Sequence, residues 1–274
     1  MKNHPVSIRL AFLGASAFAL PQASAAIVGI ENFNYADGSI ANLSGGTGWN
    51  YVRTAEPGAL PAAPSDWDLV GGVPTVSGGA LITNGSSAKR EYGGSTEGSA
   101  AGSNEREGAF RGTGSVFISS TFRLDSLLAT GTTQWGGMSS YDFGAERIFF
   151  GLPSQSTATR FFGLVESGIG TTLSTIPVEA NTTYTLVAMV NFDTDVIGLW
   201  VNPDGSDNAT SYDVSRAYTA TSWSTAVRLG SAAGTNATWD NLRVADNFAE
   251  AVPETSSALL SLLGGAVALR RRRI

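Results

Sequence analysis

The sequence predicts an all-β protein built as an antiparallel two-sheet sandwich, and three observations support this fold class. Glycine contributes 33 of the 274 residues, and serine, threonine and asparagine are frequent beside the glycines. Apolar runs are seldom longer than about five residues, which is the length of strands rather than of helices. The region between the two chain ends holds no long amphipathic helical pattern and no internal repeat. Short strands joined by polar turns are typical of a single antiparallel sandwich.

The segment SVFISSTFRL, residues 115–124, has the alternation of a half-buried strand. Val116, Ile118, Phe122 and Leu124 fall on one face, and the polar residues lie mostly on the other. Two further apolar runs, RIFFGL and RFFGLVE, flank the polar loop PSQSTAT. We expect these two runs to pair as a hairpin.

A second hairpin is predicted over residues 183–201. Its first strand places Tyr184, Leu186, Ala188 and Val190 on one face, and Asp193–Asp195 supply turn residues. The returning strand places apolar side chains on one face at Ile197, Leu199 and Val201. The last strand, within TWDNLRVAD, has Leu242 and Val244 on one side and Trp239 and Arg243 on the other.

Residues 44–112 are rich in Gly, Ser, Pro and Ala and show little periodicity. We predict long loops at one edge of the sandwich for this region. Loops of this length can also form binding surfaces. No shift in composition marks a second domain.

The N-terminal residues 1–25 have the order of a signal peptide. Lys2 and Arg9 precede an apolar stretch, and Ala23-Ser24-Ala25 fits a signal-peptidase site. The alternative is a buried N-terminal helix. The charge order, the short apolar length and the small residues favour export.

The C-terminal residues 250–274 combine a Pro-Glu motif, an apolar run and an arginine cluster. The run Ser256–Leu269 would form about 21 Å of helix, whereas a hydrocarbon core is about 30 Å thick. The run is therefore short for a lasting span, and the arginines would stay on the cytoplasmic side. The residues that carry this pattern are Val252, Pro253, Glu254, Arg270, Arg271, Arg272 and Arg273.

This tail resembles the PEP-CTERM sorting signal of exported proteins of Gram-negative bacteria, with Thr255 in place of the usual second proline. The resemblance implies a membrane protease of the exosortase family as a partner. It also implies transient association with the inner membrane, followed by release to the cell surface or extracellular matrix. It covers about the last two dozen residues and identifies an address rather than an activity.

Removal of both ends would leave an acidic domain, residues 26–249, without histidine or cysteine. Residues 26–252 exclude six of the 17 basic residues, two in the leader and four in the tail, and one of the 23 acidic residues, Glu254, so their net charge is 11 − 22 = −11. Nucleic acid is a poor partner for such a surface. His4 is the only histidine and lies in the leader, and the chain has no cysteine. Ser-His-Asp triads, cysteine nucleophiles and ordinary zinc sites are therefore excluded from the domain.

A second resemblance covers nearly all of this domain. The opening ENFNYADGSI with GGTGW, the central YTLVAMVNFDTDVIGLWVNP and the closing WDNLRVADNFAEAV are similar to concanavalin-like, laminin-G-type jelly-roll domains. The resemblance implies a jelly-roll sandwich and, loosely, contact with glycan or matrix. Fold does not by itself fix function.

A structural calcium ion is one candidate site. Alternation places Asp240 with Leu242 and Val244 on the inward face, and a buried carboxylate needs a cation or hydrogen-bond partners. The jelly-roll resemblance implies an ion between the first and last strands, where Glu31 would lie. An arginine partner, or a strand bulge that turns Asp240 outward, is the alternative.

Carboxylate pairs and tryptophans are the other candidates. Glycoside hydrolysis needs two carboxyl groups about 5 to 9.5 Å apart. The candidate pairs are Asp66 with Asp68, Glu105 with Glu107, and Asp193 with Asp195. Tryptophan rings can stack on sugars or can be core residues. The six tryptophans are Trp49, Trp67, Trp135, Trp200, Trp223 and Trp239, and alternation puts Trp200 and Trp239 opposite the aliphatic face of their strands.

The sequence thus favours an exported, non-catalytic jelly-roll protein that binds glycan or has a structural role. A polysaccharide hydrolase or lyase that uses a carboxylate pair is the alternative. An adhesive matrix protein without a small ligand is the third hypothesis.

Overall fold

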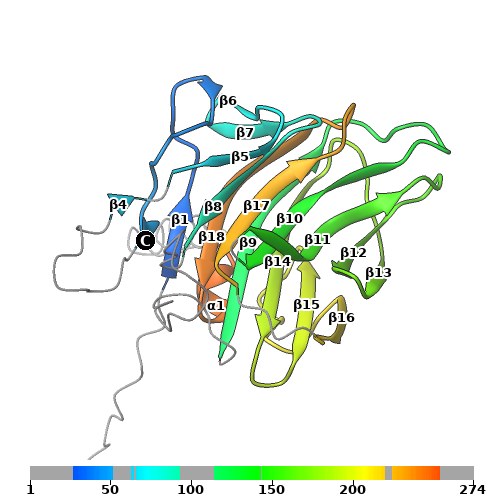
Figure 1. The fold of residues 1–274 in the computed structure, drawn as a ribbon. Helices are drawn as coiled ribbons and strands as arrows, with labels where there is room; N and C mark the ends of the chain where they lie inside the picture. The colour runs from blue at the N-terminus through cyan, green and yellow to red at the C-terminus, as the bar shows by residue number, and fades with distance from the viewer. Residues whose placement is uncertain are drawn as a thin grey trace, which may run out of the picture.

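Two antiparallel β-sheets lie face to face as two layers (Figure 1), which confirms the predicted all-β sandwich of jelly-roll type. The computed structural model describes residues 27–51, 63–64, 66–92, 114–142, 144–219 and 224–253. The chain repeatedly crosses between the layers, for example from β7 to β8 to β9 and from β16 to β17 to β18. At these crossings, strands that follow each other in the sequence contribute to opposite sheets.

The first sheet has nine strands, and the second has seven. The order in the first is β16 (Val214–Ala217), β15 (Val196–Val201), β14 (Thr183–Asn191), β9 (Ser115–Leu124), β18 (Ala237–Ala245), β7 (Ala80–Thr83), β6 (Thr75–Ser77) and β2 (Gly38–Ser39), with β1 (Ile27–Glu31) also paired to β18. The order in the second is β13 (Gly170–Pro177), β12 (Phe161–Glu166), β11 (Ala145–Gln155), β10 (Gln134–Asp142), β17 (Ala226–Ser231), β8 (Ser87–Glu91) and β5 (Asp68–Gly71). A separate pair joins β3 (Asn50–Tyr51) to β4 (Ala63–Pro64).

The main core lies between the two sheets and follows the predicted alternation. On β9, Val116, Ile118, Phe122 and Leu124 are all buried in it. The two predicted hairpins form as β11 with β12 and as β14 with β15. The apolar residues predicted to share a face on β14 and β15 belong to the same core: Tyr184, Leu186, Ala188, Val190, Ile197, Leu199 and Val201.

A second apolar cluster covers part of the outer face of the nine-stranded sheet. Trp200 lies in it opposite the aliphatic face of β15, as predicted. The short helix α1 (Phe248–Ala251) packs here, with the Phe248 and Trp200 ring centroids 4.8 Å apart. The Ser119 hydroxyl on β9 donates to the carbonyl of Ala251 at 2.5 Å. The predicted segment 250–274 therefore begins inside a helix that is docked on the sandwich.

The last strand departs from the predicted alternation because β18 contains a bulge. Its pairing with β9 shifts register between Asp240 and Arg243, and Asn241 has a φ of 52°. The extra residue reverses the side on which the preceding side chains point. Trp239 therefore lies in the main core with Leu242, so its predicted outward position is wrong. The bulge was one of the two alternatives to the calcium site.

The prediction of loops over residues 44–112 is wrong for a large part of that region. Residues 66–92 contain β5, β6, β7 and β8. All five residues of β8 are buried, including Lys89, Arg90 and Glu91. Residues 52–62 and 93–113 lie outside the described part of the chain.

No helix in the described part of the chain has the length and apolar character needed to cross a membrane. The leader, residues 1–25, and residues 254–274 of the tail lie outside the described residues.

Candidate functional site

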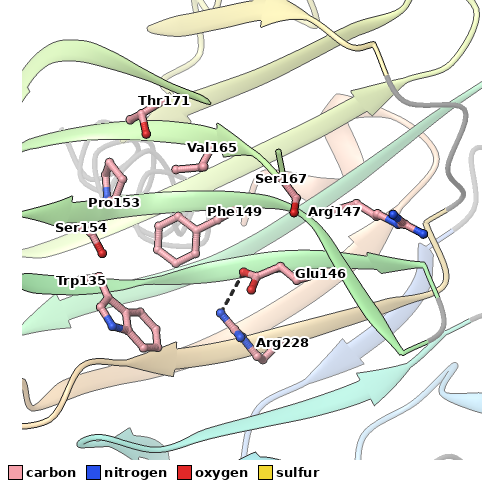
Figure 2. A pocket seen from close by; sticks show the side chains of 10 residues that line it. All are labelled: Trp135, Glu146, Arg147, Phe149, Pro153, Ser154, Val165, Ser167, Thr171 and Arg228. Carbon is pink, nitrogen blue, oxygen red and sulfur yellow. Dashed lines mark hydrogen bonds and ion pairs between the residues drawn. The ribbon is translucent and has the colours of Figure 1, made fainter. Parts of the chain in front are cut away.

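A pocket of about 390 Å³ opens on the outer face of the seven-stranded sheet (Figure 2). Its lining comes from β10, β11, β12, β13 and β17 and from the turn after β12. One row of paired residues crosses these strands and forms the middle of the face. Arg228 pairs with Ser139, Ser139 with Phe149, Phe149 with Val165, and Val165 with Thr171. Because paired residues point to the same side of a sheet, strand pairing alone brings these side chains together.

A bulge in β11 adds two charged residues to the pocket. Tyr141 on β10 pairs with Glu146, whereas Ser140 pairs with Ile148, so Arg147 is the extra residue. Two adjacent residues at a bulge can point to the same side of the sheet. Glu146 and Arg147 accordingly both line the pocket.

A glycine lets the Phe149 ring lie against the sheet, because a Cβ atom on Gly137 would lie 2.3 Å from Cζ of Phe149. The Phe149 ring lies at the centre of the pocket lining (Figure 2). Trp135 meets it edge to face, with the ring centroids 6.1 Å apart. The pocket therefore has an apolar floor.

A hydrogen-bonded group of polar residues borders this floor. Glu146 Oε1 accepts from the Ser139 hydroxyl at 2.6 Å and from Arg228 Nη2 at 2.9 Å. Arg228 Nη1 also donates to the Tyr141 hydroxyl at 3.0 Å. The Arg228 guanidinium lies 5.6 Å from the ring centroids of Trp135 and Tyr141. These contacts fix Glu146 and Arg228 beside the aromatic rings.

The Tyr141 hydroxyl is poorly suited to act as a base. Burial raises the pKa of Tyr141, and the nearby Arg228 charge lowers it by less. A phenol with a raised pKa stays protonated at neutral pH. Tyr141 is therefore a neutral phenol whose oxygen accepts a hydrogen bond from Arg228.

One of the predicted tryptophans, Trp135, lines this pocket. Trp49, Trp67 and Trp239 belong to the main core, and Trp200 belongs to the second cluster. Trp223 lies outside the described residues. The described tryptophans therefore do not form an exposed group.

The two predicted carboxylate pairs that fall within the described residues do not line the pocket. Asp193 and Asp195 lie in the turn between β14 and β15, as the sequence suggested, where Asp193 accepts from the backbone N–H of Gly114. Asp68 begins β5 and faces Lys89. Glu105 and Glu107 lie outside the described residues.

Several lining residues were missed by the sequence analysis. The sequence predicted a hairpin strand over part of β11 but assigned no site to Glu146, Arg147 or Phe149 in it. It did not predict β17, which carries Arg228. The RIFFGL run contains Arg147 and Phe149, and its charged residue beside an aromatic pair was the available clue.

The two proposed calcium ligands lie in the predicted strands, since β1 and β18 pair and Glu31 faces Leu242. Glu31 already has a cation partner, because Arg90 Nη1 lies 2.5 Å from Glu31 Oε2. Its carboxylate also accepts from the Tyr35 hydroxyl at 2.5 Å and from the Phe33 N–H at 2.7 Å. Asp240 Oδ1 accepts from the N–H of Asn241. Among the described residues no group of three or more His, Cys, Asp or Glu side chains could hold a metal ion. The calcium site stays a prediction.

The Asp240→Asn substitution tests the predicted calcium site through the pH dependence of stability. Burial raises the pKa of Asp240, the Asn241 N–H lowers it by less, and the Glu31 charge raises it further. A raised folded-state pKa means that ionised Asp240 costs stability, and that this cost is relieved as the pH falls. Without calcium, Asp240→Asn should therefore raise the free energy of unfolding at pH 7, and the difference should vanish below about pH 4.

Denaturant unfolding of both proteins, in chelator and in calcium, makes this measurement. We expect the same result in both buffers, because Arg90 already neutralises Glu31. The calcium site would be established instead if calcium raised the stability of the wild-type protein and Asp240→Asn abolished this increase.

The sorting residues are described only in part. Val252 packs against the second apolar cluster, its N–H donates to the carbonyl of Phe248, and Pro253 is the last described residue. Glu254 and Arg270–Arg273 lie outside the described residues.

No protein-family model matches the chain, and no curated protein matches it significantly. Solved structures do match. Trypanosoma rangeli sialidase is similar over 81% of this chain and 30% of its own, with 14% identity and a TM-score of 0.50. The CBM2 module of the evolved Dit of Lactobacillus casei phage J-1 is similar over 81% of this chain and 96% of its own, with 10% identity and a TM-score of 0.42. A further sialidase matches over 16% of its own length, with 11% identity and a TM-score of 0.42. The chain thus spans less than a third of either sialidase, and at 14% identity the T. rangeli match shows the fold alone.

Proposed function

We propose that this domain binds a glycan on the outer face of the seven-stranded sheet and does so without catalysis. The observation that carries the proposal is the pairing of an apolar floor, Phe149 and Trp135, with the fixed polar side chains of Glu146 and Arg228 in one open pocket. A sugar ring has an apolar face and a rim of hydroxyl groups, so it fits such a lining. The sandwich fold is compatible with this role but does not imply it.

The chemistry of the pocket supports binding over bond cleavage. Hydrolysis would need a carboxyl pair at a suitable separation, and neither Asp66 with Asp68 nor Asp193 with Asp195 lines the pocket. Glu146 is the one carboxylate that the described residues contribute to the pocket lining, and its Oε1 already accepts from Arg228 and Ser139. Tyr141 has a raised pKa and is a poor base for a lyase. The domain contains no histidine that could take either role.

A panel of polysaccharides incubated with purified residues 26–253 tests the proposal. We expect binding of at least one polysaccharide, measured by affinity electrophoresis, without release of reducing or unsaturated ends. Release of such ends would overturn the proposal and show that the protein is a polysaccharide hydrolase or lyase. Absence of both binding and release across the panel would overturn it in favour of an adhesive matrix protein without a small ligand.

We further propose that the chain is exported through residues 1–25 and sorted through Val252, Pro253, Glu254 and the terminal arginines. The exosortase-type protease would be its partner at the inner membrane, and extracellular polysaccharide its partner at the cell surface or in the matrix. The support is the order of charge and apolar residues at both ends.

Sorting makes a definite prediction about the mature chain. Protein recovered from the cell surface or medium of its source is expected to lack Arg270–Arg273, because cleavage near the Pro253-Glu254 motif removes them. Mass spectrometry of the C-terminal peptide makes the measurement. An intact C-terminus in the surface fraction would contradict the sorting proposal.

A further inference from the structure

We infer that the pocket takes a neutral sugar, recognised through neighbouring hydroxyl groups, and discriminates against acidic sugars. This inference rests on the proposed glycan-binding function and specifies the chemical class of its ligand. Three observations carry it: the charge balance of the sheet face, the donors and acceptors left open in the pocket, and the net charge of the domain.

The cations on this face are already balanced by carboxylates. Arg228 lies 2.9 Å from Glu146, and Arg147 lies 3.4 Å from Asp142. On the neighbouring β8, Lys89 lies 3.1 Å from Glu91 and 4.0 Å from Asp68. These are the cationic side chains that the described residues contribute to the outer face of this sheet. A carboxylate ligand would therefore meet no net positive charge and would have to compete with Glu146 or Asp142 for its arginine.

Sugar hydroxyls, by contrast, match the hydrogen-bond donors and acceptors that remain unpaired in the pocket. The Glu146 side chain is 34% exposed. Within the described residues, its Oε1 accepts two hydrogen bonds and its Oε2 accepts none. The Arg147 side chain is 39% exposed, and one of its nitrogens makes a long contact to Asp142. Glu146 can only accept, and Arg147 can only donate. Two adjacent hydroxyls satisfy both, because one can donate to Glu146 and the other can accept from Arg147.

The charge of the domain acts in the same direction. Residues 26–253 contain 11 basic and 22 acidic side chains, so the net charge is 11 − 22 = −11. A negatively charged protein repels a polyanion before contact, and the repulsion weakens as salt rises. A neutral chain approaches without this barrier.

Matched oligosaccharide pairs test the inference. Soluble β-1,4-glucan, β-1,4-mannan and α-1,4-galactan are each titrated beside the uronate of the same linkage, namely glucuronan, mannuronan and galacturonan. We expect the tightest binder to be neutral and its uronate counterpart to bind at least about tenfold more weakly at low salt. Binding of the neutral member should change less than about twofold with ionic strength, because no counter-ions are exchanged.

The Glu146→Gln variant gives a second readout, because it leaves Arg228 without its carboxylate and makes the site net positive. We expect this variant to lose affinity for the neutral oligosaccharide and to gain affinity for the uronate. Glu179→Gln is the matched control, because it makes the same chemical and charge change at an exposed residue after β13. It should alter neither affinity. Melting temperatures of both variants show that the fold is retained.

The outcomes separate this inference from the function on which it rests. Tighter binding of a uronate by the wild-type domain, weakening with salt, would overturn the neutral-sugar inference and leave glycan binding in place. Equal effects of Glu146→Gln and Glu179→Gln would also overturn it, because the charge of the pocket would then not matter. If neither member of any pair binds, and no polysaccharide of the panel binds either, the proposed glycan-binding function itself is overturned.

Discussion

Replacing Trp135 with alanine is expected to weaken glycan binding by at least about tenfold while leaving the fold intact. Trp135 is only partly buried, so its removal leaves no large internal cavity. Stacking of an aromatic ring contributes about 0.5 to 1.5 kcal/mol beyond the burial of its area. Arg228 also lies over this ring, so the substitution loosens the group that holds Glu146. Both effects lower affinity.

Isothermal titration of the wild-type and Trp135→Ala domains with the best glycan from the panel makes the measurement. Ile169→Ala is the control, since Ile169 is a large apolar side chain that is 55% exposed and does not line the pocket. It should bind as the wild type does. Equal affinity of Trp135→Ala and wild type would show that the glycan does not contact this ring.

Replacing Arg90 with methionine is expected to destabilise the domain by about 3 to 5 kcal/mol, the largest stability effect that we predict. Arg90 is fully buried and neutralises Glu31. Its Nη2 donates to the Gly45 carbonyl at 2.8 Å, and its guanidinium lies 4.8 Å from the Trp49 ring centroid. Removal of Arg90 leaves the Glu31 charge buried without a cation. It also frees the loop around Gly45 from β8.

Urea unfolding followed by tryptophan fluorescence measures this effect as a fall in the midpoint concentration. Arg123→Met is the matched control, because Arg123 pairs with Asp125 and both side chains are well exposed, at 43% and 38%. Exposed ion pairs contribute at most about 1 kcal/mol. Similar losses for the two variants would contradict the assignment of Arg90 and Glu31 as the pair that ties β1 and β8 together.

The strands that the sequence predicted well are those with regular alternation. On β9 and β14 the residues that face the core are apolar at every second position, apart from Ser120 on β9, and this alternation predicts which face meets the core. β8 was missed because its sequence, SAKRE, carries three charges. Arg90 is buried beside Glu31, and Lys89 beside Glu91, and neither partnership shows in the local sequence.

The candidate site depends on pairings between distant segments, and these are not visible in the sequence. Arg228 and Glu146 are 82 residues apart and meet because β10 lies between β17 and β11. A bulge brings Arg147 to the same side as Glu146, and alternation in β11 would have placed them on opposite faces. The same physical cause made the predicted position of Trp239 wrong. A one-residue bulge reverses the facing of a strand, and single-residue shifts leave little trace in composition or periodicity.

The most direct test of glycan binding on the outer face of the seven-stranded sheet is a residue-resolved map of the bound surface. The ¹⁵N-labelled domain, residues 26–253, is titrated with the best glycan from the panel while its amide and indole signals are followed by NMR. We predict that the shifts gather at Trp135, at Glu146–Phe149 and at Val165 and Arg228, while signals from α1 and from the turn at Asp193–Asp195 stay in place. Shifts that gather on the nine-stranded sheet or its turns, with the Trp135 indole signal unchanged, would contradict the account.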